Sequence, residues 1–132
     1  MENKKKEQII KEYFRMWVER DFSKIADIFN ENIYYSECYG PEYFHLSEIY
    51  LWIEDMLKKQ KVLEWTIKQF IHSEDTTTVE WFFKEQQGEI INGFDGVSLI
   101  QFNEDGKISI IKEFESKAEH IAPYRKVYSN AE

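Results

Sequence analysis

The hydrophobic pattern of the first part of the chain is helical. Apolar side chains recur at intervals of three and four residues and predict a helix over residues 7–20, with a buried stripe formed by Ile9, Ile10, Tyr13, Phe14 and Trp17. Asp21 can cap a second, shorter helix that continues to Phe29. Because the two helices follow each other so closely, we expect them to pack as a hairpin.

The pattern then changes to that of strands, interrupted by one helix. Residues 33–39 are rich in β-forming side chains and predict a strand that ends at Gly40-Pro41. A third helix should follow, with Ser47 as its cap and an apolar stripe that ends at Leu57. Beyond it, turn residues and β-formers alternate and predict four strands, over residues 62–72, 76–86, 89–102 and 107–116.

Two glycines lie inside the longest of these strands, and they bear on the shape of the sheet. Gly93 and Gly96 interrupt residues 89–102, where glycine usually marks a bulge or a sharp bend. Such bends would curl the sheet into part of a cone. The expected fold is therefore α+β, with a cone-shaped, curved antiparallel β-sheet packed against three helices from the N-terminal half, in one domain over residues 1–132.

Composition narrows the functions open to such a domain. Aromatic residues make up 17% of the chain, more than a small core usually needs, which favours a ring-lined pocket. The net charge of -8 argues against binding to nucleic acid. The single Cys38 excludes an internal disulfide and a cysteine-built metal site, and the three histidines have no metal-binding spacing.

Targeting and cofactor signals are not found in the sequence. No apolar run approaches the ~20 residues that cross a bilayer, and the charged N-terminus lacks the apolar core of a signal peptide. We therefore expect a soluble, cytoplasmic protein that does not bind membranes. There is no glycine-rich phosphate loop, and we expect neither a cofactor nor a metal.

The order of elements and three short stretches carry a family resemblance. The stretches are Asp21-Phe-Ser-Lys-Ile-Ala-Asp-Ile-Phe, Ser36-Glu-Cys-Tyr-Gly-Pro and Phe102-Asn-Glu-Asp-Gly-Lys. Over roughly residues 7–116 the chain resembles the nuclear transport factor 2-like superfamily, which includes SnoaL-like polyketide cyclases and ketosteroid isomerases. The resemblance implies the fold, but the superfamily holds enzymes, binding modules and dimerisation domains on one scaffold.

The resemblance to ketosteroid isomerases implies three catalytic positions. It places Glu37 at the carboxylate that moves the proton, Tyr13 at the oxyanion donor and Ser98 at the third position, where the isomerases carry a protonated Asp. Glu37 would lie among aromatic side chains, which raises the pKa of a carboxyl and makes it a usable base. The alternatives are an exposed or lysine-paired Glu37 at a strand end and a Tyr13 that is ordinary core.

The same comparison suggests which side chains line the pocket. It directs Glu113 and Glu115 to the concave face, and strand alternation would direct Glu80 and Lys84 there as well. Wall candidates are Trp17, Trp52, Trp65 and Phe82. The opposite face would then carry Val79, Trp81, Phe83, Val97 and Leu99, and its apolar character predicts a homodimer through the sheet. A register error of one residue would exchange the two faces.

Two functions remain open from the sequence. The chain is either a small-molecule-binding protein of the SnoaL-like kind, with proton-transfer activity of the isomerase, cyclase or dehydratase type, or a non-catalytic homodimeric binding or scaffold module. An empty cavity with converging polar groups would favour the first function, and a cavity filled by the chain's own side chains the second.

Overall fold

A single curved sheet dominates the computed structural model, which describes residues 1–117 and 119–125. Its strands follow the order β2-β1-β6-β5-β4-β3. Neighbouring strands are antiparallel except for β1 and β6, which run parallel. The helices are α1 (Asn3–Glu19), α2 (Ile25–Ile28) and α3 (His45–Lys59), and the strands are β1 (Phe29–Ser36), β2 (Glu42–Phe44), β3 (Lys61–Ser73), β4 (Thr76–Gln87), β5 (Ile90–Phe102) and β6 (Ile108–Lys117).

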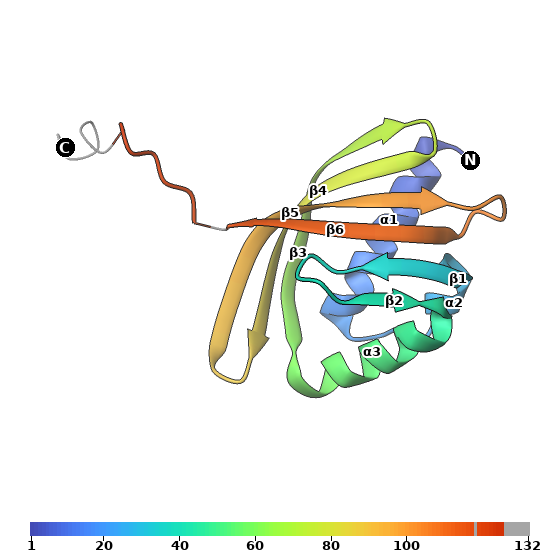
Figure 1. Ribbon diagram of the computed structural model, residues 1–132, viewed down its shortest axis with the longest axis horizontal. Coiled ribbons are helices and arrows are strands. Elements are labelled where there is room, and N and C mark those ends of the chain that lie inside the picture. The colour runs from blue at the N-terminus through green and yellow to red at the C-terminus, as the bar shows by residue number, and fades with distance from the viewer. Residues whose placement is uncertain (118, 126–132) are drawn as a thin grey trace.

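Helices α1 and α3 lie against the concave side of this sheet (Figure 1). The buried stripe of α1 includes Tyr13, Phe14 and Trp17, as its spacing predicts. At the end of α1, Arg20 adopts a left-handed conformation, and its guanidinium donates to the carbonyl oxygens of Leu57 and Gln60 at the end of α3. These bonds satisfy carbonyls that a helix end leaves free, and they tie the two helices together. The structure thus confirms the predicted α+β cone.

The region between α1 and α3 differs from its prediction. The second helix is a single turn, because Phe29 already belongs to β1, which ends at Ser36 rather than residue 39. The three-residue strand β2 was not predicted, since three residues are too few to give a period. Helix α3 begins at His45 instead of after Ser47, and the carboxylate of Glu48 accepts a hydrogen bond from the backbone N–H of Phe44 (2.8 Å).

The facing of β4 is the main correction to the sequence prediction. Val79, Trp81 and Phe83 point into the concave side, where Val79 and Trp81 are fully buried core residues. Glu80, Phe82 and Lys84 occupy the alternate positions and face outward, so the prediction that they line the pocket is wrong. The outer face of the sheet also cannot contain Val79, Trp81 and Phe83, whereas Val97 and Leu99 do lie on it.

Gly93 and Gly96 do not mark a bulge, which was one of the two features predicted for them. The pairing of β4 with β5 continues without a shift through Gly93 and Gly96, and the register shifts lie in β1, in β3 and near the end of β5. A Cβ at Gly96 would overlap the ring of Trp81 and the carbonyl oxygen of Phe114. Glycine is therefore needed at this position so that Trp81 can pack directly on the backbone of β5.

The turn over residues 103–106 is as predicted. Asn103 accepts hydrogen bonds on its side chain from the backbone N–H groups of Asp105 and Lys107, and Gly106 has a φ of 78°. This arrangement is typical of Asn and Gly in tight turns. It fixes the register in which β6, and with it Glu113, lies beside β5.

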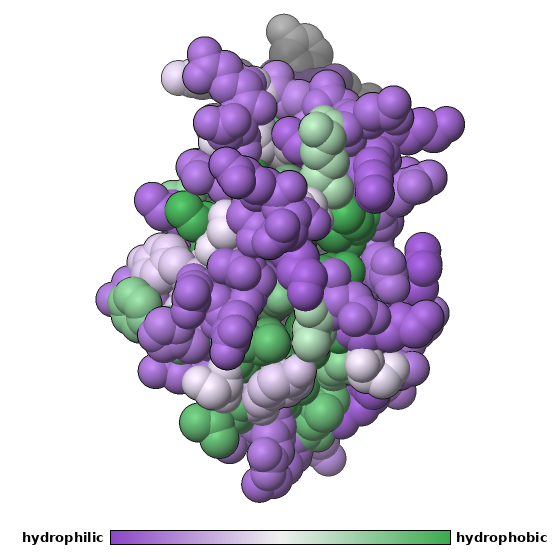
Figure 2. Space-filling model, turned by 90° about the vertical axis from the view of Figure 1, so that its right-hand side faces the viewer, coloured by the Kyte–Doolittle hydropathy of each residue, from purple (hydrophilic) through white to green (hydrophobic). Residues whose placement is uncertain are grey.

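The outer surface of the molecule is mostly hydrophilic on the side drawn in Figure 2, where apolar side chains form separate areas rather than one patch. Within residues 1–117 and 119–125, no helix is long and apolar enough to span a membrane. After β6, residues 119–125 are exposed and run outward (Figure 1). From the sequence alone, the tail over residues 117–132 could either cross the pocket mouth or extend away from the domain, and residues 118 and 126–132 lie outside the described residues.

Candidate functional site

The concave side of the sheet holds two adjoining cavities. The outer one, which we call the cleft, has a volume of about 540 Å³ and lies between α3 and the strands β4 and β5. The inner one, the inner chamber, has a volume of about 30 Å³ and lies deeper in the cone. Both cavities are lined by Glu37, Tyr39, Trp52, Met56, Gln60, Phe83 and Phe94. A molecule bound in the cleft could therefore extend a small group into the inner chamber.

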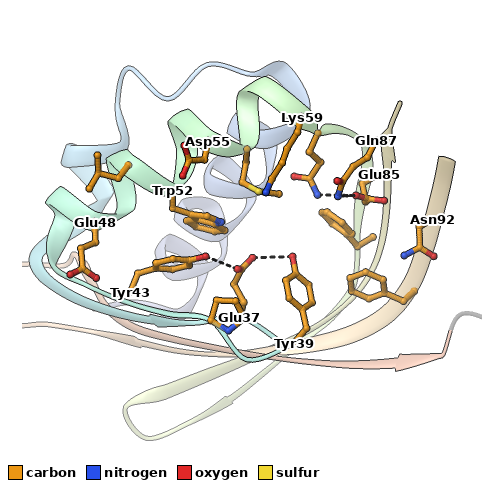
Figure 3. Close-up of a pocket in the computed structure, with 16 residues that line it drawn as sticks. Glu37, Tyr39, Tyr43, Glu48, Trp52, Asp55, Lys59, Glu85, Gln87 and Asn92 are labelled. Carbon is orange, nitrogen blue, oxygen red and sulfur yellow. Dashed lines mark hydrogen bonds between the residues drawn. The ribbon is translucent and has the colours of Figure 1, made fainter. Parts of the chain in front are cut away.

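Glu37 lies just after β1, at the boundary between the two cavities (Figure 3). Its Oε1 accepts a hydrogen bond from the phenol of Tyr39 (3.1 Å), and its Oε2 accepts one from Tyr43 (2.8 Å). Burial raises the pKa of the Glu37 carboxyl, while the two phenols and, more weakly, Lys59 oppose that rise. The carboxylate is thus held in position without an ion-pair partner within 4 Å among the described residues.

Glu113 faces the inner chamber from β6 and is the most strongly perturbed carboxyl in the described part of the chain. Its Oε2 accepts a hydrogen bond from the phenol of Tyr35 (2.7 Å). Burial, with a smaller contribution from the charge of Glu37, raises the pKa of Glu113 to about 8. A carboxyl with this pKa is mostly protonated at pH 7 and can donate a hydrogen bond.

A relay of hydrogen bonds runs from α1 to Glu113. The indole N–H of Trp17 donates to the phenol oxygen of Tyr13 (3.0 Å), Tyr13 donates to Tyr35 (2.7 Å), and Tyr35 donates to Glu113. Burial raises the pKa of both phenols well above the usual range, so both remain protonated. The relay fixes which oxygen of Glu113 is already engaged and leaves Oε1 as the position for its own proton.

Two of the three positions that the resemblance suggested lie behind the cavity walls. Tyr13 lines neither cavity, because Tyr35 lies between it and the chamber. The phenol of Tyr13 donates its hydrogen bond to Tyr35 and not into the chamber. Ser98 is fully buried and accepts a hydrogen bond from the indole N–H of Trp81 (2.9 Å), whose ring covers it. Of the three, Glu37 alone lines the cavities.

The predicted ligand-contacting residues divide into three groups. Trp17 and Trp65 line the inner chamber, as does Glu113, and Trp52 lines both cavities. Glu115 is exposed beyond the chamber and borders a separate shallow groove with Lys117. The outward residues of β4 are apart from both cavities: Glu80, Phe82 and Lys84.

Several residues at the cavities were not identified as site residues from the sequence. Tyr35 and Tyr43 orient the two acids, and Glu85 lies at the cleft with Gln60. The indole N–H groups of Trp52 and Trp65 are buried and find no acceptor in the described residues. Alternation could have indicated Tyr35, which shares the strand face of Ile33, but it says nothing about a partner such as Glu113, 78 residues away.

The chemistry of the cavity walls does not favour a thiol nucleophile. Burial raises the pKa of the Cys38 thiol to about 12, so Cys38 carries no useful fraction of thiolate at neutral pH. Among residues 1–117 and 119–125, no three His, Cys, Asp or Glu side chains are grouped so that they could hold a metal ion. What the walls do combine is a positioned carboxylate, a neutral carboxylic acid and aromatic rings.

Structural neighbours share this fold at low sequence identity. A putative polyketide cyclase from Xanthomonas campestris pv. campestris superposes with a TM-score of 0.69 at 8% identity, covering 86% of this chain and 91% of that one. An epoxide hydrolase of M. tuberculosis, described as LEH-like, gives 0.76 at 10% identity, with 86% and 79% covered. An NTF2-like protein of unknown function from Exiguobacterium gives 0.72 at 18% identity, with 82% and 98% covered.

The sequence itself places the chain in a family. Among curated proteins, none is significantly similar to it. The model of the SnoaL-like domain matches residues 10–111, which include the part of α1 from residue 10 onward, all of the elements from α2 to β5 and the first part of β6. The chain belongs to the SnoaL-like domain family.

Proposed function

We propose that this protein binds a small, largely apolar molecule in the cleft and transfers a proton on it, in the manner of an isomerase, cyclase or dehydratase. Glu37 is the general base and Glu113 the neutral acid that faces the developing oxyanion. The proposal is supported by one observation. The carboxyl groups of Glu37 and Glu113 line the same chamber, and their surroundings raise the pKa of Glu113 more than that of Glu37. Such pairs are typical of acid–base catalysis.

Glu37 is suited to remove a proton from carbon. Its two phenol partners stabilise the carboxylate and fix its orientation, and each oxygen keeps a lone pair free for the substrate proton. Burial in turn raises the basicity of the group. A positioned base of this kind contributes roughly 10²–10⁴-fold to a proton-transfer rate.

Glu113 is suited to stabilise the negative charge that forms on the substrate oxygen. Because its pKa is raised to about 8, it keeps a proton at pH 7 that it can donate into the chamber. The rings of Trp52 and Trp65 belong to the walls of the same chamber, and their indole N–H groups are buried without an acceptor in the described residues. Tyr13 is a positioning residue in this scheme, because it acts through Tyr35.

Deuterium exchange on a model ketone tests the proposal. With 2-tetralone in D₂O, the wild type should accelerate exchange of the α protons, followed by NMR, over buffer alone. Glu37→Gln should lower that acceleration by about 100-fold or more, and Glu80→Gln, on the outer face of β4, should leave it unchanged. Wild-type exchange at the buffer rate, or full activity in Glu37→Gln, would contradict the proposed chemistry.

A non-catalytic binding module is the second candidate, and the size of the inner chamber favours it. About 30 Å³ holds only a water or one small group, so the aromatic walls already fill most of the cone. In that case a ligand occupies the cleft alone. Ligands would then protect the protein against thermal unfolding, with no exchange or turnover in any of them.

Homodimerisation through the outer sheet face remains part of the proposal, with a corrected set of residues. Phe82, Val97, Leu99 and Phe114 lie there on neighbouring strands, and Phe114 is 52% exposed. An isologous contact would cover them. Sedimentation at micromolar concentration should give a dimer that Phe114→Glu converts to a monomer, and a monomeric wild type would refute it. A cytoplasmic location stays a prediction from the sequence.

A further inference from the structure

Glu85 is a buried carboxylate at the cleft that the proposed proton transfer does not use. It lies near the end of β4, lines the cleft and is only 6% exposed. The side-chain amides of Gln60 (3.1 Å) and Gln87 (2.8 Å) both donate to its Oε1 (Figure 3). Its Oε2 accepts no hydrogen bond from the described residues, although the side chain faces the cavity.

No cation of the described residues pairs with this carboxylate. The donors to Oε1 are neutral amides, and the ion pairs present elsewhere do not include Glu85. The cleft carries Glu37, Glu48, Asp55 and Glu85 against the single Lys59, which forms no ion pair within 4 Å in the described part of the chain. A buried carboxylate is favourable when it is paired, so this side of the cleft suits a positive ligand group.

The walls beside Glu85 suit the same kind of group. Phe83 and Phe94 line the cleft on the adjacent strands, with ring centroids 5.3 Å apart, and Asn92 pairs with Glu85 across the sheet. The face of an aromatic ring attracts a cation, most strongly where water is excluded. The Oε2 of Glu85 can in addition accept a hydrogen bond from an N–H group, which the rings cannot.

We infer that the cleft recognises a protonated amino group on its ligand, held by the Oε2 of Glu85 against the rings of Phe83 and Phe94. The inference rests on the proposed use of the cleft for a small molecule, and it names the class of that molecule: a primary or secondary amine with an apolar body. Glu85 is then a specificity-determining residue, and Gln60 and Gln87 position it.

Three fragments of the same shape and different charge test this inference on the wild type. Benzylamine, benzyl alcohol and benzoate are titrated at pH 7 and low salt, with affinities taken from chemical shifts of the backbone amide of Asn92 and the side-chain amides of Gln60 and Gln87. Benzylamine should bind about tenfold more tightly than benzyl alcohol, because its hydrogen bond to Oε2 is charge-assisted. Benzoate should bind most weakly, and added salt should reduce the preference for the amine.

Variants locate the preference. Glu85→Gln is nearly isosteric and should reduce the difference between benzylamine and benzyl alcohol to about threefold or less, whereas Glu80→Gln, on the outer face of the same strand, should keep it. Glu37→Gln removes another acid that lines the cleft, and it should reduce the preference less than Glu85→Gln does, because both oxygens of Glu37 already accept hydrogen bonds from phenols. Thermal unfolding of each variant shows that it is folded, and the wild-type series is informative without any variant.

The outcomes separate this inference from the proposed proton transfer. Equal affinity of the wild type for amine and alcohol overturns the inference, as does a preference that survives in Glu85→Gln and is lost in Glu37→Gln. An amine preference that depends on Glu85, in a protein that does not exchange the protons of 2-tetralone, supports the inference and refutes the proton transfer. If the wild type exchanges the protons of 2-tetralone but does not prefer the amine, the proton transfer is supported and the inference about the amino group is refuted.

Discussion

The inner chamber and the cleft, which forms the mouth of the cone, share walls on β4 and β5, yet they raise the pKa values of their acids to different extents. In the chamber, Glu113 is buried and accepts one phenol hydrogen bond, and burial raises its pKa to about 8. At the mouth, Glu37 accepts two phenol hydrogen bonds and lies nearer to Lys59, which limits the rise of its pKa. Depth and the number of donors, rather than residue type, decide which acid keeps its proton.

The two regions also differ in packing. Trp65 and Trp81 line the chamber and pack edge to face with ring centroids 5.7 Å apart, and behind them Trp81 leaves no room for a Cβ at Gly96. The mouth is lined by rings and long polar side chains that still leave about 540 Å³ free. Changes in the chamber should therefore affect stability strongly, and changes at the mouth should affect mainly binding.

The largest effect is expected from adding a methyl group on the side of β5 that packs against the chamber wall at Trp81. Gly96→Ala forces a Cβ into the Trp81 ring and the Phe114 carbonyl oxygen, so it should lower the free energy of unfolding by about 3 kcal/mol. Gly93→Ala places its Cβ on the outer face of the same strand, where it meets the Phe82 ring at 3.1 Å and the Phe83 carbonyl oxygen at 3.2 Å, and should cost about 1 kcal/mol or less. Urea unfolding measures both, and equal losses would show that the Trp81 side of β5 is packed no more tightly than its outer face.

Sequence reasoning predicted the parts of the fold that repeat a period. The long strands β3, β5 and β6, the turn over residues 103–106 and the buried stripe of α1 follow from alternation, turn chemistry and helical spacing. The strand β2 was missed, because three residues after Gly40-Pro41 carry no period.

The facing of β4 could not be decided from the sequence, and this affected the candidate site. Alternation places Val79, Trp81 and Phe83 together, but an apolar strand face can be buried in the core or in a subunit contact, and local pattern does not distinguish the two. The run Trp81-Phe82-Phe83 makes both faces aromatic. The hydrogen-bond partners of the acids could not be predicted either. Tyr35 and Glu113, like Gln60 and Glu85, are far apart in the sequence and meet only in the tertiary fold.

The second effect in size concerns the pH dependence of stability. The pKa of Glu113 is raised from about 4.5 in the unfolded chain to about 8 in the folded protein, so the folded state binds more protons between these values. Stability should therefore fall as pH rises from 4.5 to 8, by a few kcal/mol on the order-of-magnitude scale of 1.4 kcal/mol per pKa unit. Glu113→Gln should flatten this profile.

Glu37→Gln is the matched variant for the mouth. The pKa of Glu37 is raised in the same direction but is opposed by two phenols, so its removal should change the pH profile less than that of Glu113. Urea unfolding at several pH values between 5 and 8.5 makes the comparison. A wild-type profile that is flat, or that rises with pH over this range, would mean that Glu113 is ionised in the folded protein.

The smallest expected effect is the change in a carboxyl pKa when one phenol hydrogen bond is removed in either region. Tyr35→Phe removes the one phenol donor of Glu113, and Tyr43→Phe removes one of two at Glu37, so both carboxyl pKa values should rise. A hydrogen bond to a charged group contributes about 1.5–3 kcal/mol in a buried site, equivalent to about one to two pKa units. We expect the full rise at Glu113 and less at Glu37, which keeps Tyr39 and the charge of Lys59. Carbon-detected NMR titration of the two carboxyl carbons measures both values in each variant. A larger rise at Glu37 than at Glu113 would mean that the mouth, rather than the chamber, is the less solvated region, and the assignment of base and acid would have to be reversed.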